Sequence, residues 1–177
     1  ASEVMEDLQA FVDTMSARTK RPVTVSASSG TAGLWLLPRL AAFQALHPDI
    51  DVRITADNRL VDLSLDGVDL AIRYCPEERA PHAAEPLFME TVAPVASPSL
   101  GLHGPITAER LAGLVLIEFD EPRNRHPWLR WSEWLAARGL EAEDARGHLL
   151  FNQYDQLIQA TIAGQGIALG RLELLST

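Results

Sequence analysis

Short apolar runs of strand length alternate with amphipathic segments of helical length along the chain. Val23 to Ala27 and Ile50 to Thr55 alternate between apolar and polar residues, which predicts two strands. Apolar residues from about Gly33 to Leu46 recur at helical spacing and predict the helix that joins these strands. A short helix over residues 60–65 and a strand from Val68 to Arg73 follow. This β-α-β-α-β order indicates a parallel, doubly wound α/β sheet.

The second half of the chain continues the alternation less regularly. Predicted strands lie at residues 87–96, 114–119, 147–151 and 166–169, and predicted helices at 107–110, 127–138 and 152–164. Pro94 lacks a backbone N–H, which indicates an edge strand, a bulge or a crossover between two lobes. Gly139 suits the position after a helix, and Asn152 suits the cap of the last helix, with Asp155 as the partner of a capping box.

The first 20 residues carry a helical pattern of their own. Met5, Leu8, Val12 and Met15 follow one another at steps of three and four residues, the a/d spacing by which two helices pack. Fewer than three heptads are present, so two interpretations stay open: a helix that pairs with a second copy of the chain, or an amphipathic helix that lies on its own domain.

Composition narrows the class of protein. The chain has 177 residues, 47% hydrophobic, so it can bury a sizeable core. Its formal net charge of −9 disfavours nucleic-acid binding, because affinity for phosphates comes from Lys and Arg. One cysteine, Cys75, indicates a reducing compartment. No apolar run approaches the ~18 residues of a membrane span, and the acidic N-terminus is unlike an export signal. We therefore expect a cytoplasmic protein without membrane contact.

Several stretches resemble the effector-binding domains of LysR-type transcriptional regulators. The matching stretches are residues 36–43 and 47–54 (the first helix–strand unit), 65–73 (the third strand) and 159–169 (the second lobe). Trp128, Trp131 and Trp134 beside Gly139-Leu140 resemble the branch that includes glycine-cleavage and β-lactamase regulators. The ordered set covers nearly the whole chain and is more specific than any one piece.

The resemblance implies a fold and a division into domains. The fold is that of type 2 periplasmic binding proteins, in which two Rossmann-like lobes hold a ligand between them, here preceded by a linker helix. The implied parts are a linker and dimerisation helix at 1–20, lobe I at 21–96, lobe II at 97–170, and the start of a return toward lobe I at 171–177. The family's N-terminal winged helix-turn-helix and the rest of its C-terminal return are not in this sequence, and there is no initial Met. We therefore expect a truncated piece of a longer protein.

Polar turns at strand ends supply candidate effector ligands. The turn that starts at Ser28 lies between the carboxyl end of a strand and a helix start, where open α/β sheets bind ligands and backbone N–H groups favour anions. An ordinary capping turn has the same composition, but the resemblance favours the effector site. Arg73 suits a forked pair with an anion. We predict that the effector contacts Ser28, Ser29, Gly30, Thr31, Asn58, Arg73, Tyr74, Asn152 and Gln153.

The sequence gives little indication of a catalytic, metal or cofactor site. Gly164, Gly166 and Gly170 resemble a dinucleotide motif, but here the glycines close a helix and open a strand, the reverse of the order that motif needs. The five histidines show no metal-ligand spacing, and no His is placed to activate Ser28 or Ser29. We expect no catalytic residue, metal or cofactor. The three clustered tryptophans predict core packing, with an aromatic ligand wall as the alternative.

These observations favour a domain that senses a small, anionic effector and performs no chemistry on it. Binding would shift the conformation of a dimer or tetramer. DNA would be bound only by the absent N-terminal helix-turn-helix. The alternative is a periplasmic solute-binding protein of the same fold. The residues encoded upstream of Ala1 separate the two, because a regulator carries a helix-turn-helix there and a solute carrier an export signal.

Overall fold

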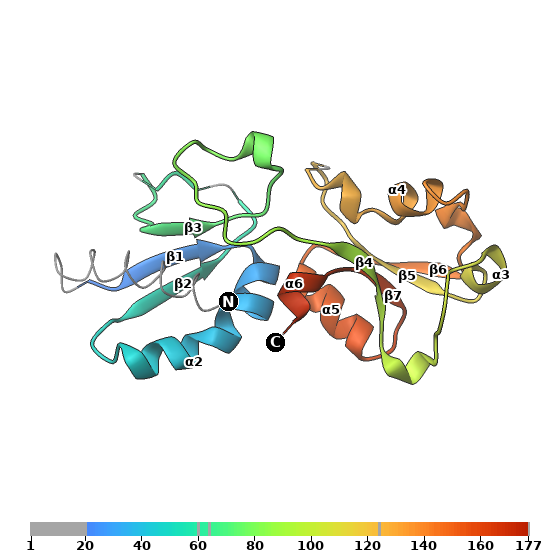
Figure 1. The fold of residues 1–177 in the computed structure, drawn as a ribbon, viewed down its shortest axis with the longest axis horizontal. Coiled ribbons are helices and arrows are strands. Elements are labelled where there is room, and N and C mark those ends of the chain that lie inside the picture. The colour runs from blue at the N-terminus through green and yellow to red at the C-terminus, as the bar shows by residue number, and fades with distance from the viewer. Residues whose placement is uncertain (1–20, 60, 64, 124, 177) are drawn as a thin grey trace. The chain divides into compact units, whose positions relative to one another are not determined.

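The computed structural model describes residues 21–176 apart from Leu60, Ser64 and Asn124, and these residues form two compact units with one sheet each (Figure 1). The chain passes from the first unit to the second between Met89 and Glu90. We predicted this boundary after residue 96. It lies earlier because the strand β4 (Val92–Ala96) pairs with β7 (Ile167–Arg171), the last of the four strands of the second unit along the chain. The helix predicted over residues 1–20 lies outside the described residues.

The first unit holds a parallel sheet, as predicted, and its strands stand in the order β2-β1-β3. Its strands are β1 (Val23–Ala27), β2 (Val52–Ala56) and β3 (Leu70–Ile72). Every residue of β1 is buried, because β1 is the central strand. The connection from β1 to β2 is a π-helical segment (Thr31–Leu36) followed by α2 (Leu37–Leu46). A 3-10 turn (Glu77–Arg79) lies in the loop after β3.

The helix predicted over residues 60–65 is wrong for the described residues of that segment, which form turns. The backbone N–H of Asp62 donates to the Asp66 carboxylate over 2.9 Å, and the Leu65 N–H donates to the Asp62 carboxylate over 3.3 Å. Aspartate side chains that bond to nearby backbone groups compete with a helical ladder. A turn is closed here by the bond from the Asp66 N–H to the Asp62 carbonyl oxygen.

The second unit holds a four-stranded sheet in the order β4-β7-β5-β6. β5 (Val115–Phe119) is parallel to both β6 (Gly147–Phe151) and β7, whereas β4 is antiparallel to β7. Its helices are α3 (Ala108–Leu111), α4 (Trp131–Ala136), α5 (Tyr154–Ile162) and α6 (Leu172–Leu175), with 3-10 turns at Pro98–Leu100, Pro127–Leu129 and Ala142–Asp144. Pro94 is on β4 and lies opposite Leu169 of β7. Because β4 is at the edge of the sheet, the edge-strand alternative for Pro94 is confirmed.

The predicted helix over residues 127–138 is divided in the structure. Pro127 opens a 3-10 turn, Arg130 is extended, and α4 begins only at Trp131. Gly139 has a φ of 69°, which confirms the left-handed position expected after a helix.

Trp131 is the centre of the core of the second unit. Its side chain is 0% exposed, and its indole Nε1 donates to the carbonyl oxygen of Ile117 over 3.0 Å. Trp134 packs edge-on against Trp131 with ring centroids 5.8 Å apart, and the Arg138 guanidinium lies over the Trp134 ring. Core packing is therefore confirmed for Trp131. Trp128 is half-buried and contacts His126 edge-on.

All three clustered glycines have structural causes, and at Gly170 a Cβ would clash with the side chain of Val95 on the neighbouring strand β4. Gly164, just after α5, has a φ of 75°, a conformation that favours glycine. A Cβ on Gly166 would clash with the backbone oxygen of Val115, because β7 enters the sheet there beside β5. The glycine pattern is therefore explained by the end of α5 and by the close approach of neighbouring strands. No helix in the described part of the chain is long and apolar enough to cross a membrane.

Candidate effector-binding site

The carboxyl ends of the parallel strands in the first unit bring several predicted residues to one sheet edge. Ser28 follows β1, Asn58 lies just beyond β2, and Arg73 follows β3. The backbone N–H of Ser29 donates to Asn58 Oδ1 over 3.2 Å, so the turn after β1 and the loop after β2 are in direct contact. This grouping is what a parallel topology predicts for residues that follow neighbouring strands.

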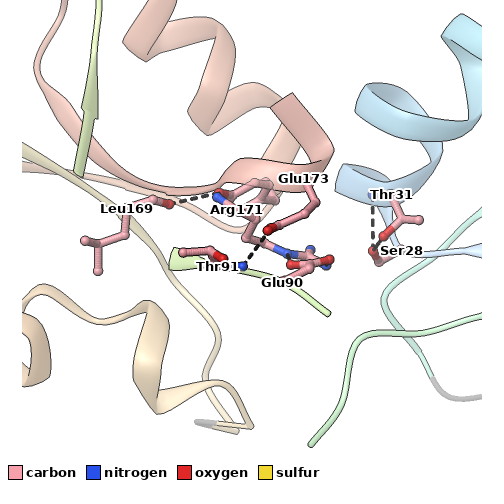
Figure 2. A network of polar contacts seen from close by, with 8 residues as sticks. Ser28, Thr31, Glu90, Thr91, Leu169, Arg171 and Glu173 are labelled. Atoms are coloured by element: carbon pink, nitrogen blue, oxygen red, sulfur yellow. Dashed lines mark hydrogen bonds and ion pairs between the residues drawn. The ribbon is translucent and has the colours of Figure 1, made fainter. Parts of the chain in front are cut away.

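The turn from Ser28 to Thr31 presents hydroxyl groups. Ser28 Oγ and Thr31 Oγ1 lie 2.9 Å apart and share a hydrogen bond (Figure 2). The Ser29 hydroxyl oxygen is shielded from solvent and has no hydrogen-bond partner among the described residues. Because shielded polar groups nearly always have a partner, this hydroxyl is the strongest candidate in the turn to meet a ligand. Gly30 is buried, with helical backbone angles.

The backbone amides of the turn are largely engaged by the protein itself. The Ser29 N–H donates to Asn58, the Thr31 N–H to Ser28 Oγ, and the Ala32 N–H to the Ser28 carbonyl oxygen. We expected such amides to bind an anion directly; in the structure the hydroxyls are the more available donors. The π-helical segment that follows is closed by a bond from the Leu37 N–H to the Ala32 carbonyl oxygen, a wide turn often found at functional sites.

We predicted that the Arg73 guanidinium pairs with an anion as a fork, but in the structure it donates hydrogen bonds to oxygens of the protein itself. Its Nη1 donates to the carbonyl oxygens of Ser26 and Ile72, each over 2.9 Å, and its Nη2 donates to Ser26 Oγ over 2.7 Å and to the Arg59 carbonyl oxygen over 3.0 Å. Both terminal nitrogens thus face protein oxygens. Tyr74, the next predicted residue, is half-buried.

Arg59 is the other cation at this edge, and its side chain pairs with Asp57. Its Nε lies 2.7 Å from Asp57 Oδ2, while 83% of the arginine side chain is exposed. Hydrogen bonds from the Arg59 backbone N–H and then from its side chain lower the pKa of Asp57, which therefore stays ionised. The net charge that Arg59 offers to an anion is reduced by this pair.

A hollow of about 400 Å³ in the first unit lies away from this cluster. Its lining residues are Pro22, Gln44, His47, Pro48, Ile50, Asp51, Val52 and Arg53. Pro22 and Asp51 directly precede β1 and β2, so the hollow is at the amino ends of the strands. Ligands of open α/β sheets bind at the carboxyl ends, and we therefore place the candidate site at Ser28 to Thr31 rather than in this hollow.

In the second unit, Asn152 and Gln153 lie between β6 and α5. The predicted cap by Asn152 is wrong: α5 begins at Tyr154, Gln153 stands at its cap position, and no side chain caps the helix there. The Asp155 Oδ1 is shielded and has no hydrogen-bond partner among the described residues. The contribution of Asn152 and Gln153 to effector binding stays a prediction.

A charged loop beyond β5 was not predicted as part of any site. Glu121 is buried, and its carboxylate accepts hydrogen bonds from the backbone N–H and the Nε of Arg125. Burial raises the pKa of Glu121, but the bonds from Arg125 together lower it further, so the pKa lies below its usual value. The i,i+4 spacing of Glu121 and Arg125 was the feature of the sequence from which this ion pair could have been predicted. The Asp120 N–H donates to the Phe151 carbonyl oxygen, which ties this loop to the end of β6.

A buried ion pair fastens the start of the second unit. Arg171 Nε and Nη2 donate to the two carboxylate oxygens of Glu90 over 2.5 and 2.6 Å, and each side chain is 5% exposed (Figure 2). The Tyr154 hydroxyl donates to the Leu169 carbonyl oxygen and accepts from the Arg171 N–H, each over 2.8 Å. These residues lie around β7 and hold the segment that leads into β4.

The chain is thus a domain of two α/β units, each built around one sheet. The sequence model described as LysR substrate binding domain matches residues 16–176, and the chain belongs to this family. The predicted resemblance is confirmed. Among the described residues, no three His, Cys, Asp or Glu side chains are grouped as metal ligands would be.

Among individual relatives, the chain is 34% identical over 170 residues to the glycine cleavage system transcriptional activator of Escherichia coli K12, covering 94% of this chain and 54% of the relative. It is 30% identical over 148 residues to the activator AmpR of Rhodobacter capsulatus, covering 82% and 47%. The chain thus spans about half the length of these curated relatives.

Solved structures agree with the family. The effector domain of AmpR from Pseudomonas aeruginosa matches with a TM-score of 0.63 at 31% identity, covering 88% of this chain and 73% of that one. The regulatory domain of CrgA from Neisseria meningitidis matches with a TM-score of 0.64 at 23% identity, covering 89% and 75%, and supports the fold alone. The predicted fold class is confirmed.

Proposed function

We propose that this chain is the effector-sensing part of a LysR-type transcriptional regulator and that it binds a small anionic molecule without chemical turnover. The observation that carries the proposal is the contact between the Ser28–Thr31 turn and Asn58 at the carboxyl edge of a parallel sheet, with the shielded Ser29 hydroxyl still unsatisfied by described residues. The relatives named above are transcriptional activators, which favours a regulator over a solute carrier.

The proposed mechanism is a shift between two conformations of the regulator. An effector acts only through its different affinity for the two states, so its contacts at the turn must change with the conformation. DNA contacts would be made by a helix-turn-helix elsewhere in the full-length protein, because this chain carries a net charge of −9. A regulator that acts on DNA would work in the bacterial cytoplasm.

Ser29→Ala and Thr31→Val test the proposed site. Each removes one hydroxyl donor, and one hydrogen bond contributes about 0.5–1.5 kcal/mol, so we expect roughly 2–10-fold weaker effector binding with the fold unchanged. A thermal-shift screen of small carboxylates and phosphate esters on the unmodified chain identifies a ligand first, and titration calorimetry then compares the variants.

Ser132→Ala is the matched control, because Ser132 is an exposed serine on α4 in the second unit. It should leave the affinity unchanged. Equal affinities for the unmodified chain, Ser29→Ala and Thr31→Val would remove the turn from the site.

We further propose that the regulator is a homo-oligomer, a dimer or tetramer, through the a/d seam of Met5, Leu8, Val12 and Met15. These residues lie outside the described part of the chain, and their spacing supports the proposal. Leu8→Glu places a charge in this apolar seam and should lower the sedimentation coefficient at a given concentration. Gln9→Glu adds the same charge one residue along and should not. An unchanged oligomer for Leu8→Glu would mean that the seam packs within one chain.

A further inference from the structure

Arg73 joins the ends of all three strands of the first unit. From its position after β3, it donates to the Ile72 carbonyl oxygen on its own strand, to the carbonyl and hydroxyl oxygens of Ser26 on β1, and to the Arg59 carbonyl oxygen beyond β2. Four acceptors on three segments are reached by one guanidinium, whose five N–H donors have a fixed planar geometry.

The segments that Arg73 joins are those that carry the candidate ligand contacts. Ser26 is fully buried and stands two residues before Ser28, the first residue of the turn. Arg59 directly follows Asn58, whose side chain accepts the Ser29 N–H. The spacing between the turn and the loop therefore depends on the backbone at Ser26 and at Arg59, and Arg73 donates hydrogen bonds to the carbonyl oxygens of both residues.

We propose that Arg73 is a positioning residue for the candidate site: it sets the distance between the Ser28–Thr31 turn and the Asp57–Arg59 loop and does not itself contact the effector. This inference rests on the proposed function for its biological meaning, whereas the geometric role stands on the contacts alone. It also replaces our prediction that Arg73 binds an anion as a fork.

Amide hydrogen exchange on the effector-free chain tests this role. Two reporters cross between the segments: the Ser29 N–H, bonded to Asn58 Oδ1, and the Asp57 N–H, bonded to the Ala27 carbonyl oxygen over 2.9 Å. Arg73→Met should speed exchange at both amides by at least about tenfold, since local opening is governed by the contacts that hold each segment. The Arg171 N–H in the second unit, bonded to the Tyr154 hydroxyl, should exchange as in the unmodified chain.

Two further variants separate geometry from charge. Arg73→Lys keeps the positive charge but not the planar fork, so the two reporters should still exchange faster than in the unmodified chain. Arg59→Met removes a nearby positive charge from an exposed side chain and leaves the Arg59 carbonyl oxygen in place, so the Ser29 reporter should be unaffected. Rescue of both reporters by lysine would mean that charge alone matters and would overturn the proposal.

The remaining outcomes also decide the question. Exchange at Ser29 and Asp57 within twofold of the unmodified chain in Arg73→Met would show that the arginine does not hold the loops. If Arg73→Met unfolds the whole first unit, the Arg73→Lys result decides: a change confined to the two reporters supports the proposal, and loss of protection throughout β1 contradicts it. Failure of the proposed function is a separate result, because it is measured as unchanged effector affinity in Ser29→Ala.

Discussion

Arg171→Met is expected to lower the free energy of unfolding of the second unit by about 3–5 kcal/mol, because it leaves the buried Glu90 carboxylate without its partner. Both side chains are 5% exposed, and the pair is bidentate at 2.5 and 2.6 Å. Urea unfolding followed by intrinsic fluorescence measures the loss, since three of the four tryptophans (128, 131 and 134) belong to this unit.

A double variant distinguishes an unpaired charge from lost packing. Glu90→Leu combined with Arg171→Met removes both buried charges and should recover most of the stability lost by Arg171→Met alone. Glu173→Gln is the milder comparison: Glu173 is partly exposed and accepts the Thr91 N–H over 2.6 Å, so about 1 kcal/mol is expected. A loss under about 1 kcal/mol for Arg171→Met would contradict the role we assign to the pair.

Trp131→Ala is expected to destabilise the second unit by about 3–5 kcal/mol, the range for emptying a buried aromatic position. The side chain is fully buried among Leu111, Leu116 and Leu135, and its removal also leaves the Ile117 carbonyl oxygen without the indole donor. Urea unfolding followed by circular dichroism is the suitable measurement, because the substitution itself changes the fluorescence.

Trp131→Phe divides this effect into its parts. Phenylalanine keeps most of the apolar volume but cannot donate to Ile117, so about 1–3 kcal/mol should be lost, the usual penalty for an unsatisfied buried acceptor. Trp128→Ala, at a half-buried ring, should cost less than Trp131→Ala. Equal losses of stability in Trp128→Ala and Trp131→Ala would show that burial does not determine how much each tryptophan contributes to stability.

Local patterns predicted the elements that alternate or repeat regularly. Val23 to Ala27 was predicted from its alternation, and the structure confirms it as the central strand of the first sheet. The parallel order followed from the helices between strands, and it is consistent with the contact between Ser29, in the turn after β1, and Asn58, beyond β2. Where aspartate side chains bond to the backbone, as at Asp62 and Asp66, apolar spacing was a poor guide, because side-chain bonds replaced the helical ladder.

Contacts between distant segments were not predictable in the same way. Glu90 and Arg171 are 81 residues apart, and no local pattern indicates that such a pair will be buried together. The contacts of the Arg73 guanidinium could not be predicted for a related reason. An arginine at a strand end is equally suited to a ligand and to neighbouring carbonyl oxygens, and only the packing of three segments shows which acceptors are present. The antiparallel β4–β7 pairing likewise has no signal in either strand alone.

The position of β7 has a consequence for biosynthesis. β7 lies inside its sheet, between β4 and β5, yet it is the last strand of the unit along the chain. While the nascent polypeptide emerges from the ribosome, β4 has no strand to pair with and β5 offers an open edge until Ile167 to Arg171 have left the exit tunnel. Open strand edges invite pairing with other chains, so this interval is when the polypeptide is most exposed to aggregation and most dependent on chaperones.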